Sequence, residues 1–88
     1  MAAAEVVMYS TSYCGYCMRA RSLLERKGVP IQEIKVDEDM REREAMMKRS
    51  GRRTVPQIFI GERHVGGYDD LAALERSGEL DQLLASTN

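Results

Sequence analysis

Residues 6–17, VVMYSTSYCGYC, join an apolar stretch to a turn-prone stretch and then to two cysteines. Residues 6–9 are predicted to form a buried strand, which the serine- and threonine-rich turn ends. A helix is expected over residues 16–27, before a glycine that stops it. Cys14 and Cys17 therefore fall where a strand gives way to a helix, and free backbone N–H groups at a helix start stabilise a thiolate.

The two cysteines are predicted to carry out redox chemistry rather than to hold the fold together. Cys14 and Cys17 are the only cysteines in the 88 residues. A bridge between them would close a very short loop and remove little conformational entropy from the unfolded chain. Small folds that depend on disulfides usually contain four or more cysteines. The leading hypothesis is a dithiol site that opens and closes a disulfide.

The bulk composition excludes several classes of protein. The chain is 43% hydrophobic and 31% charged, which is typical of one small globular domain spanning residues 1–88. A formal net charge of −1 gives no reason to expect nucleic acid or an acidic membrane as a partner. No apolar run is long enough to cross a bilayer, and residues 1–5 lack the features of a signal peptide. We therefore expect a cytoplasmic protein.

Strands and helices are predicted to alternate along the rest of the chain. Short apolar or alternating runs favour strands, and periodic runs between a capping residue and a glycine favour helices. A helix between two neighbouring strands makes them parallel. The order βαβαββα with a further helix predicts an α/β fold, a mixed four-stranded sheet flanked by helices. The expected strands are residues 31–36, 57–60 and 63–65, and the expected helices are residues 39–49, a helix capped by Asp69 or Asp70 that runs to Glu75, and residues 80–84.

The remaining aromatic, methionine and charged side chains are interpreted as packing or surface residues. The helix at residues 39–49 is expected to draw its apolar contacts from methionines, while its many charges form a solvated face. No acid or cysteine at ligand spacing accompanies the single histidine. The expected packing residues are Met40, Met46, Met47, Tyr9 and Tyr13, and the expected surface residues are Arg19, Arg21 and His64.

Three blocks of sequence follow one another along the chain: YCGYC at residues 13–17, TVPQIFIG at 54–61 and GGYDDL at 66–71. A lone C-x-x-C motif is only moderately specific, but the three blocks in this order resemble glutaredoxins of the small bacterial dithiol type. The resemblance covers nearly the whole chain and implies a thioredoxin-like fold. It further implies a monomeric, glutathione-dependent oxidoreductase that serves electron transport and cell redox homeostasis. Its partners would be glutathione and oxidised or glutathionylated proteins, with no metal.

The resemblance also gives the two cysteines different roles. Cys14, the more N-terminal and exposed one, would attack a glutathione–protein mixed disulfide and be released by a second glutathione. Cys17 would resolve protein disulfides by attacking the mixed disulfide on Cys14. Both steps are expected to need a low pKa at Cys14, because it acts as nucleophile and as leaving group. The N–H groups of Tyr16 and Cys17 are the expected source of that low pKa.

The second and third blocks are implied to bind glutathione. Val55, before a cis Pro56, would pair its backbone with the central unit of the tripeptide like an added strand; a trans proline at a strand start is the alternative. The γ-glutamyl carboxylate would lie at the helix start near Tyr68. An aspartate there would take the γ-glutamyl ammonium, or would only cap the helix. The implied glutathione-binding residues are Thr11, Tyr16, Thr54, Val55, Pro56, Gly67, Tyr68, Asp69 and Asp70.

Two positions depart from the pattern of the family. Gly15 stands where the commonest dithiol motif has proline, which loosens the backbone, adds an N–H and is expected to change the redox potential. Thr11 stands where many relatives have a lysine that contacts the glycyl carboxylate of glutathione, and it offers a hydroxyl without charge. The residues expected to replace that lysine are Arg49, Arg52, Arg53 and Gln57.

Other functions remain open at this point. Some glutaredoxins with a small residue in place of that proline bridge a [2Fe–2S] cluster across a dimer, and Gly15 makes this the main alternative. Such a cluster needs four sulfur ligands, so external thiols would be required. A thioredoxin-like donor served by a reductase is less favoured, since thioredoxins resemble W-C-G-P-C and this chain lacks tryptophan. A structural zinc site is disfavoured because two cysteines and one histidine fall short of four ligands.

Overall fold

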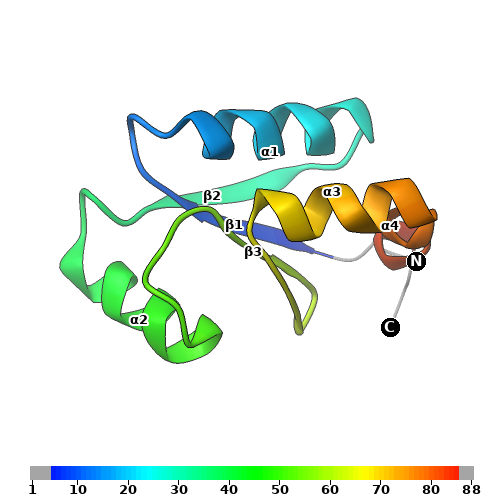
Figure 1. The fold of residues 1–88 in the computed structure, drawn as a ribbon. Helices are drawn as coiled ribbons and strands as arrows, with labels where there is room; N and C mark the ends of the chain where they lie inside the picture. The colour runs from blue at the N-terminus through cyan, green and yellow to red at the C-terminus, as the bar shows by residue number, and fades with distance from the viewer. Residues whose placement is uncertain (1–4, 86–88) are drawn as a thin grey trace.

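The structure is a computed structural model that describes residues 5–85. Residues 1–4, on which the expectation about a signal peptide largely rests, lie outside the described residues, as do residues 86–88. Within the described part, no helix combines the length and the hydropathy that a membrane crossing needs. The elements are β1 (Val6–Ser10), α1 (Gly15–Arg26), β2 (Ile31–Lys35), α2 (Met40–Ser50), β3 (Gln57–Ile60), β4 (Arg63–Gly66), α3 (Tyr68–Ser77) and α4 (Glu79–Ala85) (Figure 1).

The four strands form one mixed sheet in the order β2-β1-β3-β4. β1 runs parallel to β2 and antiparallel to β3, and β4 pairs with β3 in an antiparallel hairpin. Val6 is paired with Ile31 on one side and with Ile60 on the other. The predicted order of elements and the mixed sheet are therefore confirmed, and helix and strand ends differ from the predictions by one or two residues.

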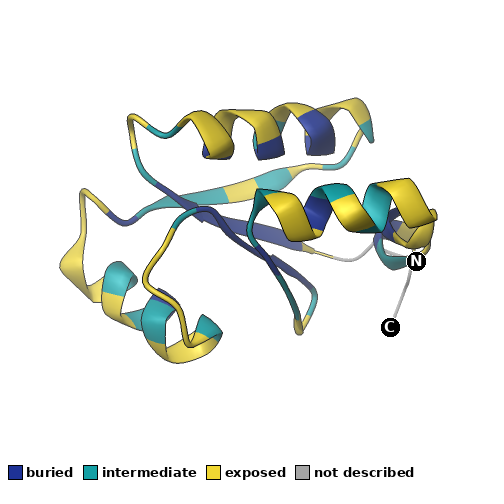
Figure 2. Cartoon of the chain, in the orientation of Figure 1, coloured by how far each residue is buried: buried dark blue, intermediate teal, exposed yellow. Residues whose placement is uncertain are grey.

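Both faces of the sheet are covered, so its central strand contributes to two apolar clusters (Figures 1 and 2). Alternate residues of a strand point to opposite faces. Met8 therefore joins the cluster beneath α1, α3 and α4, whereas Tyr9 joins the cluster beneath α2. All five residues of β1 are buried as a result. This strand delivers the chain directly to the loop that contains the first cysteine.

Two of the expected packing residues lie on the surface instead. Met46 is fully buried, whereas Met40, the first residue of α2, is 74% exposed. Tyr9 is buried with 4% exposure, whereas Tyr13 is fully exposed in the loop before Cys14. The packing roles expected for Met40 and Tyr13 are therefore wrong.

Candidate active site

Cys14 is the N-cap residue of α1, and its sulfur takes the place of the usual capping oxygen. Its backbone is extended, with φ −136° and ψ 110°, and the Cys17 N–H donates to Cys14 Sγ over 3.1 Å. The Cys14 carbonyl accepts the next helical bond from Met18 N–H at 3.1 Å. Cys14 as a residue is half-buried. An accessible sulfur thus receives an N–H bond at the positive end of a helix, which favours negative charge on it.

Cys17 lies one helical turn further along and is completely buried beneath α1. Burial raises the pKa of its thiol to about 12, and the contact with Cys14 and the Glu33 carboxylate act in the same direction. A hydrogen bond from the Thr11 backbone lowers the pKa of Cys17 but does not outweigh the burial. Both cysteines are reduced in this structure. The two thiols therefore differ sharply in access, since Cys14 is half-buried and Cys17 is completely buried.

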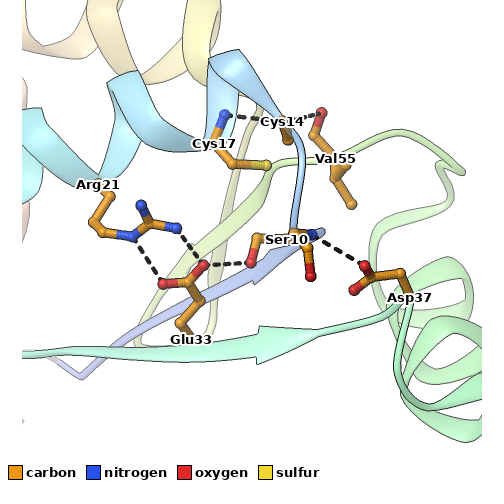
Figure 3. Close-up of polar contacts among 8 residues, drawn as sticks. Ser10, Cys14, Cys17, Arg21, Glu33, Asp37 and Val55 are labelled. Carbon is orange, nitrogen blue, oxygen red and sulfur yellow. Dashed lines mark hydrogen bonds and ion pairs between the residues drawn. The ribbon is translucent and has the colours of Figure 1, made fainter.

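A polar network lies between α1 and the sheet, close to Cys17 (Figure 3). Arg21 donates to both oxygens of Glu33, at 2.8 Å from Nε and 2.5 Å from a terminal nitrogen. The fully buried Ser10 hydroxyl donates to the same carboxylate at 2.5 Å. Arg21 and then Ser10 hold the pKa of Glu33 below its usual range. Arg21 is therefore not the plain surface charge that the sequence indicated.

The loop before β3 faces Cys14. The Val55–Pro56 peptide bond is cis, as predicted. The Val55 carbonyl lies 3.9 Å from Cys14 Sγ. Gln57 Nε2 donates to the carbonyl of Thr54 at 3.0 Å and to its hydroxyl at 3.2 Å, which ties the loop to the sheet. The second sequence block, residues 54–61, thus lies next to Cys14 of the first block.

The start of α3 differs from the prediction. The helix begins at Tyr68 with Gly67 as N-cap, so neither aspartate occupies the capping position. Asp70 instead reaches back from the first turn and accepts a bond from the Gly67 N–H at 3.0 Å. Arg52 also contacts that carboxylate, at 3.2 Å. The Gly67 bond and then Arg52 hold the pKa of Asp70 below its usual range.

Two glycines begin the third block, and Gly67 lies beside the second block. Gly66 has φ +115°, and a Cβ there would lie 2.3 Å from an oxygen of Asp70. A Cβ on Gly67 would lie 3.6 Å from the Pro56 carbonyl, which shows how closely the start of α3 passes the cis-proline loop. Glycine suits the position of Gly66 because its φ of +115° strains other residues, and a Cβ there would displace the Asp70 carboxylate. All three sequence blocks therefore meet at one end of the molecule.

Tyr16 and Tyr68 connect the starts of α1 and α3. Their ring centroids are 6.2 Å apart, and Tyr16 remains 57% exposed. The Arg19 guanidinium lies 5.6 Å from the centre of the Tyr16 ring, so Arg19 has an aromatic contact at the surface. Met18, Arg19, Ser22, Arg26 and Tyr68 line a groove of about 300 Å³ beside these rings.

The four residues expected to replace the missing lysine differ in the contacts that their side chains make. Arg49 stacks on Phe59 at 4.1 Å and donates to the Tyr9 hydroxyl at 3.3 Å. Gln57 is buried and bonded to Thr54 and His64, and Arg52 contacts Asp70. Arg53 is exposed and forms no ion pair within residues 5–85. Near Thr11, Asp37 accepts a bond from the Ser12 N–H at 3.1 Å.

His64 is more than a surface imidazole. Its ring stacks on Phe59 with centroids 4.9 Å apart, and Nε2 lies 2.7 Å from Gln57 Oε1. Burial and then the nearby Arg52 lower the pKa of His64. Within residues 5–85, no group of three or more His, Cys, Asp or Glu side chains is placed to hold a metal ion. The histidine is therefore a structural residue of the β3–β4 hairpin.

Comparison with models of protein families matches residues 6–65 of this chain to the family Glutaredoxin. The chain belongs to the glutaredoxin family. It is 56% identical over 81 residues to "Glutaredoxin" of Pseudomonas aeruginosa, covering 92% of this chain and 96% of that protein. It is 54% identical over 81 residues to "Glutaredoxin 3" of Escherichia coli, covering 92% and 98%.

A solved glutaredoxin shares the same architecture. The crystal structure of a buckwheat glutaredoxin–glutathione complex matches with a TM-score of 0.84 at 36% identity, covering 92% of this chain and 76% of that chain. The resemblance to glutaredoxins and the thioredoxin-like fold predicted from the sequence are thereby confirmed. The fold is that of a thiol–disulfide oxidoreductase, a class to which glutaredoxins generally belong.

Proposed function

We propose that this chain is a glutathione-dependent thiol–disulfide oxidoreductase in which Cys14 is the nucleophile and Cys17 the resolving thiol. The observation that carries the proposal is the contrast between an accessible sulfur that accepts an N–H bond and a completely buried partner one turn away. A nucleophile must reach its substrate, whereas a resolving thiol needs to reach only the first cysteine. Family membership supports the reaction class.

The proposed reaction begins when the Cys14 thiolate attacks a sulfur of a substrate disulfide. A new bond to Cys14 forms, the old sulfur–sulfur bond breaks, and the electron pair leaves on the departing thiolate. The bond from the Cys17 N–H, 3.1 Å from Cys14 Sγ, stabilises that sulfur as attacking group and later as leaving group. The substrate is an oxidised or glutathionylated protein.

Two routes then release Cys14. When it holds glutathione, a second glutathione thiolate attacks the mixed disulfide and leaves as oxidised glutathione. When it holds a protein, the Cys17 thiolate attacks Cys14 instead and forms the internal disulfide, which two glutathiones reduce again. The first route needs only Cys14, whereas the second needs both thiols.

The proposed glutathione site combines the cis-proline loop with the start of α3. The backbone of Val55, next to Cys14 Sγ, would pair with the central unit of the tripeptide. Free N–H groups of the ten-residue α3 would receive a carboxylate. Asp70 is already engaged by Gly67 and Arg52, so the exposed Asp69 suits the ammonium. The remaining proposed contacts are Thr11, Tyr16, Thr54, Pro56, Gly67 and Tyr68.

The setting of this function is proposed alongside it. Residues 1–88 would form a single domain that acts as a monomer in the cytoplasm, with no nucleic acid or membrane as partner. A net charge of −1 gives no electrostatic reason for either. The bound glutathione in the buckwheat complex, which shares this architecture, supports glutathione as the co-substrate.

The test is glutathione-coupled reduction of a glutathionylated peptide by the wild type, Cys17→Ser and Cys14→Ser. We expect activity to survive without Cys17 and to disappear without Cys14, because deglutathionylation uses a single thiol. An inactive wild type would overturn the proposal. Visible absorbance of protein purified without air checks the cluster-carrying alternative, and an absorbing iron–sulfur chromophore would count against a purely catalytic role.

A further inference from the structure

The ion pair between Arg21 and Glu33 lies behind the buried cysteine and has no part in the reaction described above. Arg21 comes from α1 one turn after Cys17, and Glu33 comes from the edge strand β2. Their side chains are only 30% and 21% exposed, and Ser10 fixes the carboxylate from below. In Figure 3 the Cys17 side chain leaves α1 on the side that faces Ser10 and Glu33.

The charges of this pair act on Cys17 in opposite directions. The Glu33 carboxylate disfavours a thiolate on Cys17, and the Arg21 guanidinium favours one, since like charges repel and unlike charges attract. Other elements around Cys17 contribute little charge, because β3 reads QIFI and has no titratable side chain. The other titratable or charged groups that act on Cys17 or on this pair are Cys14, Glu25 and Lys35, and the Thr11 backbone adds a hydrogen bond to Cys17.

We propose that the Arg21–Glu33 ion pair, held by Ser10, is a positioning element that sets how fast Cys17 resolves a mixed disulfide on Cys14. The inference deepens the proposed function and rests on the resolving role of Cys17. In this proposal the start of α1 stabilises Cys14, and the ion pair controls Cys17.

The step that the pair controls is the second displacement. Cys17 first loses its proton to solvent, its thiolate then attacks Cys14 Sγ, and the bond between Cys14 and the substrate sulfur breaks. The electron pair leaves with the substrate as its thiolate. No other oxidant or reductant takes part, because the mixed disulfide already holds the oxidising equivalents that end in the Cys14–Cys17 bond.

The Glu33 carboxylate has its greatest influence on the ionisation of Cys17 when Cys14 is part of a mixed disulfide. In the reduced protein, Cys14 itself opposes ionisation of Cys17 by hydrogen bonding and by charge. A Cys14 sulfur bonded to substrate carries no charge, so that opposition disappears. Burial and the Glu33 carboxylate then remain to hold the proton on Cys17. Removing one charge of the ion pair should therefore change the rate of resolution directly.

The test uses an aromatic disulfide, 5,5′-dithiobis(2-nitrobenzoate), which releases one coloured thiolate when Cys14 attacks and a second when Cys17 resolves. Glu33→Gln removes the negative charge and leaves Arg21, so we expect the second release to become about threefold faster or more at pH 7. Arg21→Gln leaves Glu33 alone, and we expect a slowing of about the same factor. The pH profile of the second release should move down in the first variant and up in the second.

The opposite signs separate an electrostatic role from a merely structural one. Both substitutions break the same ion pair, so a structural role would move both rates in the same direction. Glu75→Gln, which removes a carboxylate from the Lys27 pair at 2.6 Å, is the matched control and should leave the second release unchanged. If Arg21→Gln fails to fold, Arg21→Lys keeps the charge and should stay near the wild-type rate. Shifts of equal sign, or no shift in either variant, would overturn the proposal.

Failure of the proposed function would look different. Glutathione takes no part in the release of the coloured thiolate, so an inactive wild type in the glutathione assay leaves this result standing. A second release that persists in Cys17→Ser would show that Cys17 does not resolve, and both proposals would fall. In a Cys17→Ser background, Glu33→Gln should leave deglutathionylation unchanged, and a change there would contradict an action through Cys17.

Discussion

The starts of α1 and α3 are built from similar parts but use them differently. At α1 the acceptor is the sulfur of the N-cap residue Cys14, and the first turn contains no acidic residue. At α3 the N-cap is Gly67, which has no side chain, and the first turn contains Asp69 and Asp70. One helix start thus places a sulfur, and no carboxylate, at its N–H groups. The other combines carboxylates with free N–H groups, which suits a zwitterionic ligand.

The largest expected effect separates chemistry from capping at α1. Cys14→Ser should lower glutathione-coupled activity at least about 100-fold, because a hydroxyl is a far weaker nucleophile at neutral pH. The free energy of unfolding should stay within about 0.5 kcal/mol of the wild type, because serine is a favoured N-cap. Urea unfolding measured beside the activity assay checks both. A large loss of stability would show that the sulfur does more than cap the helix.

The next effect concerns two glycines, Gly66 shortly before α3 and Gly15 at the start of α1. Gly66→Ala should destabilise the fold by about 2 to 3 kcal/mol, since its φ is +115° and the new Cβ would lie 2.3 Å from Asp70. Gly15→Ala is the matched control: nothing lies within 4 Å of its Cβ, and alanine favours the helix by about 0.5 to 1 kcal/mol. Thermal unfolding should move in opposite directions, and equal shifts would contradict the comparison.

A third substitution makes α1 resemble α3. Gly15→Asp puts a carboxylate in the first turn, beside Cys14 Sγ, where it competes for the helix N–H groups and repels a thiolate. Alkylation of Cys14 by iodoacetamide at pH 7 should slow by about three- to tenfold. Gly15→Asn has nearly the same shape without the charge and should react almost like the wild type. If both variants slow equally, shape rather than charge would be responsible.

The smallest effect tests the carboxylate that reaches back at α3. The pKa of Asp70 is held low by Gly67 and Arg52, so its ionised form stabilises the fold above about pH 4. That stabilisation is lost as the pH falls through the lowered pKa, when the carboxyl becomes protonated. Asp70→Asn should cost about 0.5 kcal/mol at pH 7, and its stability should converge with the wild type at low pH. A constant difference between pH 7 and pH 2 would contradict this.

The order of the elements could be predicted because its signals are local. The apolar run of β1, the cap at Asp39 and the left-handed Gly51 that ends α2 are all read from neighbouring residues. Local signals also placed Cys14 at a helix start. The exact start of α3 was missed because an aspartate three residues into a helix and one at its cap look alike in sequence.

The network beneath Cys17 could not be predicted, since it depends on contacts between distant segments. Alternation over residues 33–36 places Glu33 and Lys35 opposite Ile34 and Val36, and the polar side of such a pattern normally faces solvent. The parallel register pairs Met8 with Glu33, so the carboxylate lies on the face that α1 covers. A sheet covered on both faces removes the solvent side that alternation assumes. The pairing of β1 with β2 and the packing of α1 on that face of the sheet together bring Arg21, Ser10 and Glu33 into contact.

Because Cys17 is completely buried, its reaction with a reagent reports the opening of the fold around it. An alkylating reagent that counts thiols should find one in the native protein and two in the unfolded protein. The second thiol becomes countable only when the first turns of α1 lift away from the sheet. The rate at which it appears therefore measures how often that part of the fold opens, and under mild conditions it would do so without any denaturant.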